Sequence, residues 1–174
     1  MPHKAYATSH ASQRDAIQIL TADHREVGKI FERFEKIKDK DNAANKQSLV
    51  KRACDELTIH AQVEEEIFYP ALRKALKNDD LIDEAVVEHI SVKQLIADLE
   101  SMEPGDDLYD AKFTVLGEYV KHHVKEEQNE IFPQAKKSKM DLEQLGREIT
   151  ERKEQMKSEM GLETEEEEEE KEEK

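Results

Sequence analysis

Histidine and glutamate recur at one spacing in two separate stretches of the chain. His60 precedes Glu64 by four residues, and His123 precedes Glu127 by four residues. On a helix, this spacing places the two side chains of a pair one turn apart on the same face, with about 5–6 Å between their Cβ atoms. Both side chains can then reach a metal ion that lies against that helix. One such pair is common, so the pairs alone predict little.

The pattern becomes informative because it lies on apolar stripes and because the halves of the chain repeat. His24 and His89 add single histidines at matching places, in Asp-His-Arg-Glu-Val and Glu-His-Ile-Ser-Val. Two similar strings, Ile-Phe-Tyr-Pro and Glu-Ile-Phe-Pro, follow His60 and His123 at the same distance. One histidine on an apolar stripe is more often a packed core residue than a ligand, but here four stripes each carry one. A duplicated helix pair of this kind predicts a pseudo-two-fold site.

Metal binding is the chemistry that such a core would support. Two carboxylates that point into one core are costly unless a cation or a proton compensates them. Six ligands exceed the four of a tetrahedral zinc site, and imidazole combined with carboxylate suits iron. If both glutamates bridge two ions, each ion receives two imidazoles and two carboxylate oxygens. The predicted metal-binding residues are His24, His60, Glu64, His89, His123 and Glu127.

The fourth stripe offers a second register. His122 and Glu126 have the same spacing as His123 and Glu127. His122 shares its helix face with polar residues, whereas His123 shares its face with Val120 and other apolar residues. We therefore predict that His123 and Glu127 face the core.

Helical spacing of apolar residues predicts the elements that position these side chains. The expected helices run over about residues 12–38, 42–77, 79–101, 107–137 and 141–159. Short connections favour antiparallel neighbours, so we predict an all-α, up-down-up-down four-helix bundle with an extra C-terminal helix. That helix could dock on the bundle or pair between two copies. Pro70 and Pro133 lie inside helical patterns and are expected to kink a helix or to end its regular part.

The expected organisation is a flexible arm (1–11), the bundle (12–137), the C-terminal helix (138–160) and a disordered acidic tail (161–174). His3 and His10 are expected to be exposed in the arm. The net charge is −15, of which nine glutamates and two lysines over residues 163–174 contribute −7. This balance argues against nucleic acid and anionic membranes as partners, although an acidic tail could bind a basic protein.

The compartment is predicted from features that the sequence lacks. No apolar run approaches the roughly 18 residues that a membrane span needs, and the first residues do not form a signal peptide. The single cysteine, Cys54, excludes an internal disulfide. A cytoplasmic location is therefore expected.

The spacing of the six predicted ligands resembles the hemerythrin HHE cation-binding domain family, and the likeness covers about residues 13–137. The resemblance implies two non-haem iron ions that share an oxo or hydroxo bridge when oxidised. It also implies that His24 and His60 bind one iron, that His89 and His123 bind the other, and that the two glutamates bridge them.

The chain departs from the oxygen-carrying members of that family at two positions. Those members have a further histidine where this chain has Lys93, and a bridging aspartate where it has Gln128. The ligand set is more similar to the domains of iron–sulfur repair proteins and iron-responsive proteins. The repair proteins carry a cysteine-bearing N-terminal segment, which the residues before Ser12 do not provide, so the full repair role is not expected.

The expected function is that of a di-iron protein that senses or handles oxygen, nitric oxide, peroxide or exchangeable iron. The chain shows no nucleophile–base arrangement and no phosphate-binding loop, so any catalysis would be redox chemistry at the irons. One alternative is a metal-ordered interaction module that recruits a partner through its last helix and acidic tail. Another is a structural bundle without metal. The sequence does not predict the oligomeric state.

Overall fold

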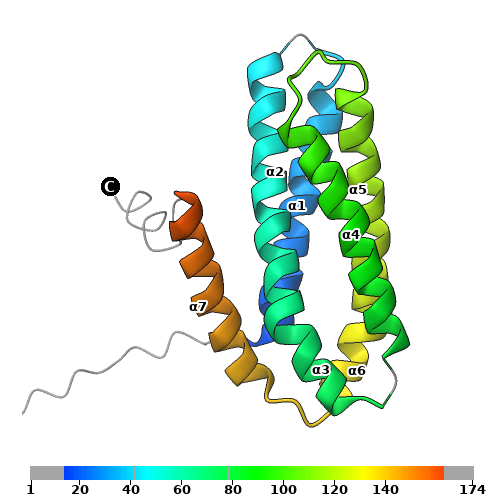
Figure 1. Cartoon of the computed structure of the whole chain (residues 1–174), viewed down its shortest axis with the longest axis vertical. Coiled ribbons are helices and arrows are strands. Elements are labelled where there is room, and N and C mark those ends of the chain that lie inside the picture. Colours follow the sequence, from blue (N-terminus) through cyan, green and yellow to red (C-terminus); the bar gives the residue numbers. More distant parts are fainter. Residues whose placement is uncertain (1–13, 41, 78, 163–174) are drawn as a thin grey trace, which may run out of the picture.

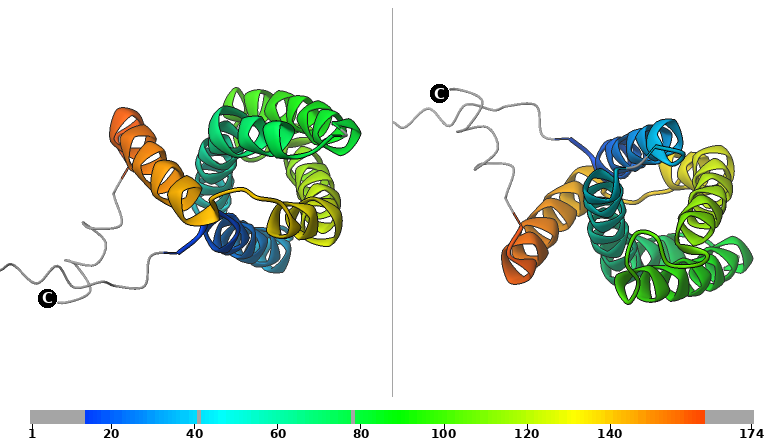
Figure 2. Two further views of the ribbon diagram at one scale, coloured as in Figure 1. Left: turned by 90° about the horizontal axis from the view of Figure 1, so that it is seen from below. Right: turned by 90° about the horizontal axis from the view of Figure 1, so that it is seen from above.

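The computed structural model describes residues 14–40, 42–77 and 79–162. Four long helical columns form a ring in the order α1, α2, α4, α5, each antiparallel to its neighbours (Figures 1 and 2). Their helices are α1 (Ala16–Ile37), α2 (Ala43–Val63), α4 (Asp80–Glu100) and α5 (Tyr109–Glu126). A fifth long helix, α7 (Leu142–Met160), lies outside the ring. The predicted all-α bundle with an extra C-terminal helix is confirmed. The predictions for residues 1–11 and for most of the acidic tail lie outside the described residues.

Local signals in the sequence set where the helices begin. Asp15 accepts a hydrogen bond from the backbone N–H of Gln18, whose side chain accepts one from the N–H of Asp15, both at 2.9 Å. This reciprocal capping box satisfies backbone donors that the first turn leaves free. Asn42 and Asp141 cap α2 and α7 with single side-chain hydrogen bonds to the backbone three residues later.

Of the two outcomes predicted for Pro70 and Pro133, a kink or an end of the regular helix, the structure shows that the regular α-helix ends before each proline. Regular α-helix stops at Val63 and at Glu126, and π-helical turns follow: η1 (Glu64–Phe68) and η2 (Glu127–Ile131). Short α-helices then resume as α3 (Tyr69–Ala75) and α6 (Phe132–Lys137), with Pro70 and Pro133 in their first turns. A proline has no N–H to donate, and its ring crowds the carbonyl four residues earlier. The wider turn relieves this crowding before the proline, so the irregularity begins at the two glutamates.

The α7 helix packs against α1 and α2, as both end views in Figure 2 show. Leu145, Ile149 and Met156 form its buried side. Of the two roles predicted for this helix, docking on the bundle is the one that the structure supports.

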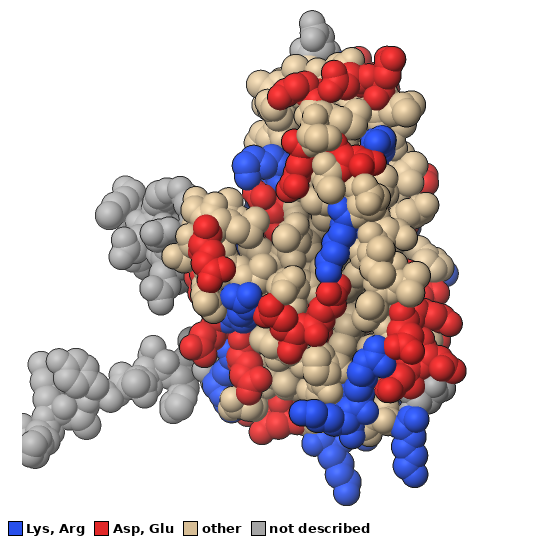
Figure 3. Space-filling view, in the orientation of Figure 1, with Lys and Arg blue, Asp and Glu red and all other residues tan. Residues whose placement is uncertain are grey.

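The apolar core consists of two clusters. One surrounds α3, α6 and α7 at one end of the bundle, and the other fills the opposite half between α1, α2, α4 and α5. The buried histidines and glutamates lie between them. Acidic and basic side chains are interspersed on the face shown in Figure 3. No helix among the described residues is long and apolar enough to span a membrane.

Candidate metal centre

All six predicted site residues meet in one buried layer, which we call the polar layer. The histidines come from α1, α2, α4 and α5, and the glutamates are the first residues of η1 and η2. No member is more than 8% exposed. The polar layer consists of His24, His60, Glu64, His89, His123 and Glu127.

The imidazoles form two pairs, as the resemblance implied. The Nε2 atoms of His24 and His60 lie 3.1 Å apart, and those of His89 and His123 also lie 3.1 Å apart. Two of the three groups of described residues that could hold a metal ion lie in this layer, and they contain one pair each and share Glu64. The third group consists of Glu88, His122 and Glu126 and lies outside the layer.

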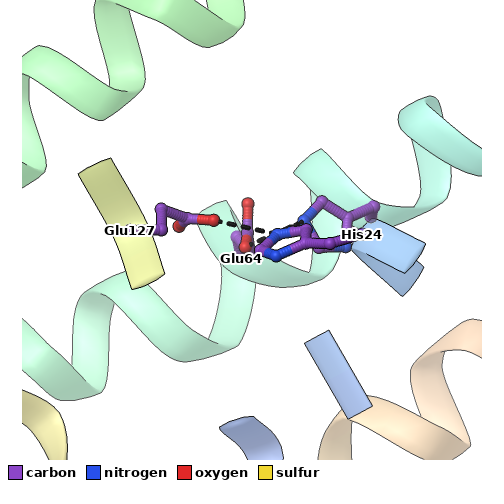
Figure 4. A group of neighbouring side chains, drawn as sticks. His24, Glu64 and Glu127 are labelled. Carbon is purple, nitrogen blue, oxygen red and sulfur yellow. Dashed lines mark hydrogen bonds and ion pairs between the residues drawn. The ribbon is translucent and has the colours of Figure 1, made fainter. Parts of the chain in front are cut away.

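The two glutamates lie between the pairs. Glu64 directs Oε1 to His60 Nε2 at 3.0 Å and Oε2 to His89 Nε2 at 3.2 Å. Glu127 Oε2 lies 3.1 Å from His24 Nε2 and 3.5 Å from His123 Nε2. Figure 4 shows Glu127 and Glu64 turned toward His24 from different helical columns. Each carboxylate therefore contacts one histidine of both pairs, which is the placement that a bridging ligand needs.

The outer nitrogens of three of the histidines face carboxylates. Nδ1 of His60 lies 3.1 Å from Asp23. Nδ1 of His89 lies 2.8 Å from Glu65, and Nδ1 of His123 lies 2.6 Å from Glu88. For His24 the corresponding neighbour is the amide of Gln128, at 3.4 Å. Carboxylate neighbours of this kind fix the ring orientation and raise the basicity of histidines that bind metal.

These outer contacts determine what the inner nitrogens can do. An ionised carboxylate only accepts hydrogen bonds, so Nδ1 of both His89 and His123 must carry a proton. In the neutral rings both Nε2 atoms are then acceptors, and they face each other at 3.1 Å. In addition, Glu64 Oε1 and Glu127 Oε2 are buried, and the polar atoms that face them are imidazole nitrogens, Nε2 of His60 at 3.0 Å and Nε2 of His24 at 3.1 Å. The layer thus directs unshared electron pairs at one another, and a proton or a metal ion must lie between them.

The charges within the layer shift its pKa values. Burial would lower the pKa of His60, but the charge of Glu64 and the hydrogen bond to Asp23 raise it well above 6.5. Burial would raise the pKa of Glu64, yet the charge and hydrogen bond of His60 and the contact with His89 hold it well below 4.5. Without metal, His60 and Glu64 therefore form a buried ion pair.

One hydroxyl group distinguishes the two halves of the layer. Tyr69 donates a hydrogen bond to Glu127 Oε1 at 2.7 Å, and its ring stacks on His89. Phe132 occupies the matching place and stacks on His24 without a hydroxyl. Burial and the charges of Glu64 and Glu127 raise the pKa of Tyr69 well above 10, so Tyr69 stays protonated and remains a donor.

The alternative register on α5 points away from the layer. The side chain of His122 is 64% exposed and lies near Glu88 and Glu126, whereas His123 is buried. Lys93 also points away from the layer. Its ammonium pairs with Glu65 at 2.7 Å, and Glu65 in turn contacts His89.

A small apolar pocket and an outer groove border the polar layer. The pocket, about 20 Å³, borders all four histidines and is otherwise lined mainly by apolar side chains, among them Val27, Leu57 and Val92. A groove of about 530 Å³ between α1 and α5 shares His24, Val120 and Val124 with that pocket.

The absence of side chains at two glycines widens this groove. Gly28 lies one turn after His24, and a Cβ added there would have no neighbour within 4 Å. Gly117 lies against the ring of Phe31 on the same groove. Lys93 is the counterpart of Gly28 in the other half, and there the Lys93–Glu65 ion pair lies between α4 and η1. The two sides of the layer are therefore unequally open.

The outer contacts do not stand out in the sequence. Asp23, Glu65 and Glu88 are three of 42 acidic residues, and they lie on half-polar helix faces. One signal was available, since each of them is the immediate chain neighbour of a predicted ligand. Tyr69 was noted only as part of a repeated string.

Comparison with known families agrees with this geometry. The model of the hemerythrin HHE cation-binding domain matches residues 15–135. The chain belongs to this family. The match covers the whole ring and the polar layer and ends before α7.

Two relatives extend the comparison. A crystal structure of a hemerythrin HHE cation-binding domain-containing protein from Mycobacterium kansasii superposes with a TM-score of 0.70 at 25% identity, over 83% of this chain and 88% of that one. A protein from Nostoc sp. (strain PCC 7120 / SAG 25.82 / UTEX 2576), described as a DNA nickase, is 25% identical over 114 residues. That match covers 66% of this chain but only 31% of the relative.

Proposed function

We propose that this HHE domain holds two non-haem iron ions in its polar layer and exposes them to small redox ligands such as oxygen, nitric oxide or peroxide. One ion would lie between His24 and His60, and the other between His89 and His123. Glu64 and Glu127 would bridge them. The same centre could serve to sense or handle those ligands or exchangeable iron.

The observation that supports this proposal is the pair of buried carboxylates without a matching fixed cation. Glu64 and Glu127 are fully buried, and no described lysine or arginine pairs with either of them. A purely structural bundle would gain nothing from two such groups, because each costs free energy that a hydrophobic residue would not. Four inward Nε2 atoms and two carboxylates fit metal ions, and this mixture of imidazole and carboxylate suits iron.

The chain would prepare the ions for reaction in three ways. The outer carboxylates hold the protons of His60, His89 and His123 on Nδ1, so Nε2 is free to bind metal. The apolar pocket keeps the open side of the layer largely free of polar groups and has room for about one water-sized molecule. Two bound ferrous ions would together supply two electrons to a small oxidant.

Metal analysis of the full chain tests this proposal. Protein purified without oxygen from iron-replete cells should contain about two irons per chain, because the six converging side chains are enough to bind two ions. The iron content of the wild type should be compared with that of a control variant in which Glu64 and Glu127 are both replaced by Gln. This replacement keeps the size of each side chain and removes its charge. That variant should fold and lose iron. One zinc ion per wild-type chain, or a folded wild-type protein without metal, would contradict the proposal.

A further inference from the structure

The α7 helix lies beyond the matched family domain, yet it is closely seated on it. A Cβ added to Gly146 would lie 2.5 Å from the carbonyl oxygen of Arg14, just before α1. Only glycine permits this approach, so the position of α7 relative to α1 is tightly defined. The buried apolar residues of α7 form one continuous cluster with residues of α1 and of α3.

One charged residue of α7 points inward and reaches the polar layer through a single intermediary. Lys153 is only 6% exposed, and its ammonium lies 2.5 Å from Asp23 Oδ1. The other oxygen of Asp23 lies 3.1 Å from Nδ1 of His60. The two oxygens of Asp23 are therefore divided between Lys153 and His60. Lysine, aspartate and histidine thus form a chain of contacts from α7 to a proposed ligand.

In the other half of the molecule, a lysine also pairs with a carboxylate beside a histidine, but this lysine, Lys93, belongs to α4 and not to α7. Glu88 is the counterpart of Asp23. Each of these acids comes directly before a histidine of its own helix and contacts the histidine of the next helix, His123 for Glu88 and His60 for Asp23. However, Glu88 is flanked by the exposed His122 and by no lysine among the described residues. The contact from α7 therefore acts on one half of the pseudo-symmetric site.

We infer that Lys153 is a positioning residue for the metal centre and that it couples the docking of α7 to metal binding. This inference rests on the proposed function. Lys153 keeps the Asp23 carboxylate against Nδ1 of His60, and that carboxylate holds the ring and its proton in the orientation that frees Nε2. If α7 moves away, Asp23 loses its buried counter-charge and turns toward water. Coupling of this kind is reciprocal, so bound metal must also stabilise the docked α7.

Two lysine variants test the inference in the full chain. Lys153→Met removes the charge but keeps an unbranched side chain. Lys157→Met is the matched control, because Lys157 is buried to a similar extent one turn later on α7, whereas the lysine that pairs with Asp23 is Lys153. After anaerobic loading with ferrous iron, transfer of iron to a chelator should be roughly tenfold faster for Lys153→Met, the lower range for loss of an outer contact. Lys157→Met should release iron at the wild-type rate.

Amide hydrogen exchange provides a readout that does not depend on reactivity. Loading with iron should slow exchange along α7 in the wild type and in Lys157→Met, and much less in Lys153→Met. Gly146→Ala disturbs the seat of α7 without changing any charge, so it should also speed iron release if docking is what matters. The inference would be wrong if the two lysine variants released iron at equal rates, or if amide exchange along α7 in the wild type were the same with and without iron. Either result would leave the proposed function standing. A wild-type chain that binds no metal would overturn the proposed function together with the inference.

Discussion

Tyr69 and Phe132 occupy matching positions in the two halves of the chain and differ by one hydroxyl group. That hydroxyl holds Glu127 by one oxygen and leaves the other oxygen, Oε2, facing two histidines. The same hydroxyl lies farther from Glu64, at 3.4 Å from Oε2, and Glu64 directs its two oxygens to His60 and His89. The two proposed bridges are therefore not equivalent, although the sequence repeat suggests that they are.

Replacing Tyr69 by Phe should make the halves alike and weaken the site. The hydrogen bond from Tyr69 to a buried carboxylate should contribute about 1.5–3 kcal/mol, so the metal-free variant should lose unfolding free energy of this order. Metal should be released roughly 10–100-fold faster, because the lost donor orients a proposed ligand. Urea unfolding and chelator transfer measure the two effects. Tyr119→Phe alters an exposed tyrosine and should change neither quantity.

Neighbouring histidines on α5 offer a direct test of the register. His123→Ala should lose iron, because His123 is buried in the polar layer. His122→Ala should retain iron, because that side chain is 64% exposed. Iron content should be compared at equal helicity by circular dichroism. Loss of iron from His122→Ala alone would mean that the exposed group of Glu88, His122 and Glu126 is the site.

At the residue scale, the apolar stripes and the repeat of the two halves together predicted the six residues that meet in the polar layer. The apolar periodicity distinguished His123 from His122, because side chains on the apolar stripe of a helix are the ones that become buried. The outer carboxylates could not be predicted in the same way, since Asp23 and Glu65 lie on faces where acidic residues are ordinary. Their partners are set by how helices are rotated in the bundle, which a single sequence does not specify.

At the scale of elements, the π-helical turns determine which side chains face the layer. The backbone N–H of Tyr69 donates to the carbonyl of Glu64, five residues earlier, and Phe132 donates likewise to Glu127. In a regular α-helix, residues five apart would diverge by about 140° around the axis. The wider turn brings Tyr69 and Glu64 to the same side. Pro70 and Pro133 predicted an irregularity, but not its position or its type.

The docking of α7 on the bundle could not be predicted from the sequence either. Its heptad-like spacing fits packing on the bundle and pairing between copies equally well. The close approach of Gly146 to α1 and the buried Lys153 decide in favour of the bundle, and both are relations between distant segments.

The groove between α1 and α5 leads to a prediction about ligand entry. Gly28→Leu should fill the groove without a clash, because space is open around that position. Azide or nitric oxide should then bind the loaded protein more slowly, by roughly the tenfold that corresponds to 1.4 kcal/mol in a barrier. Stopped-flow spectroscopy measures this rate. Gly28→Ala is the control and should have a much smaller effect, and iron content should be unchanged in both. An unchanged rate in Gly28→Leu would mean that ligands enter elsewhere.

At the scale of the whole molecule, the stability of the metal-free protein should depend on pH through its buried ion pair. The lowered pKa of Glu64 contributes stability that is present above about pH 4.5 and is lost as the pH falls through the folded pKa. The raised pKa of His60 contributes stability that is present below about pH 6.5 and is lost as the pH rises through the folded pKa. Both contributions are complete only between these values, so the metal-free chain should be most stable at mildly acidic pH.

Bound metal should reverse this trend above neutrality. Metal replaces the proton on the histidines, so the metal-loaded chain should gain stability relative to the metal-free chain as the pH rises from 6 to 8. Calorimetry of both forms over that range measures the gap between their unfolding temperatures. A gap that narrows with rising pH would show that protons, and not metal, are the natural partners of the layer.

The reaction of the whole molecule with air depends on how many imidazoles each iron receives. In the oxygen-carrying relatives, by resemblance, a further histidine one turn after the third-helix histidine saturates one iron. Here the corresponding positions are Lys93, whose ammonium is held by Glu65, and Gly28, which has no side chain. A protonated ammonium has no lone pair for a metal. Each proposed iron would therefore be left with fewer protein ligands than in those relatives, and an open position would be available to small ligands.

We expect the reduced protein to oxidise on contact with air instead of binding oxygen reversibly, because two accessible ferrous ions can both lose an electron. The protein should be reduced without oxygen, exposed to oxygen and returned to low oxygen pressure while its absorption spectrum is recorded. The ferrous spectrum should return only after a reductant is added. Lys93→His should oxidise more slowly, whereas Lys93→Gln removes the charge without supplying an imidazole and should not slow the oxidation. Recovery of the ferrous spectrum without reductant would identify the wild-type chain as an oxygen carrier.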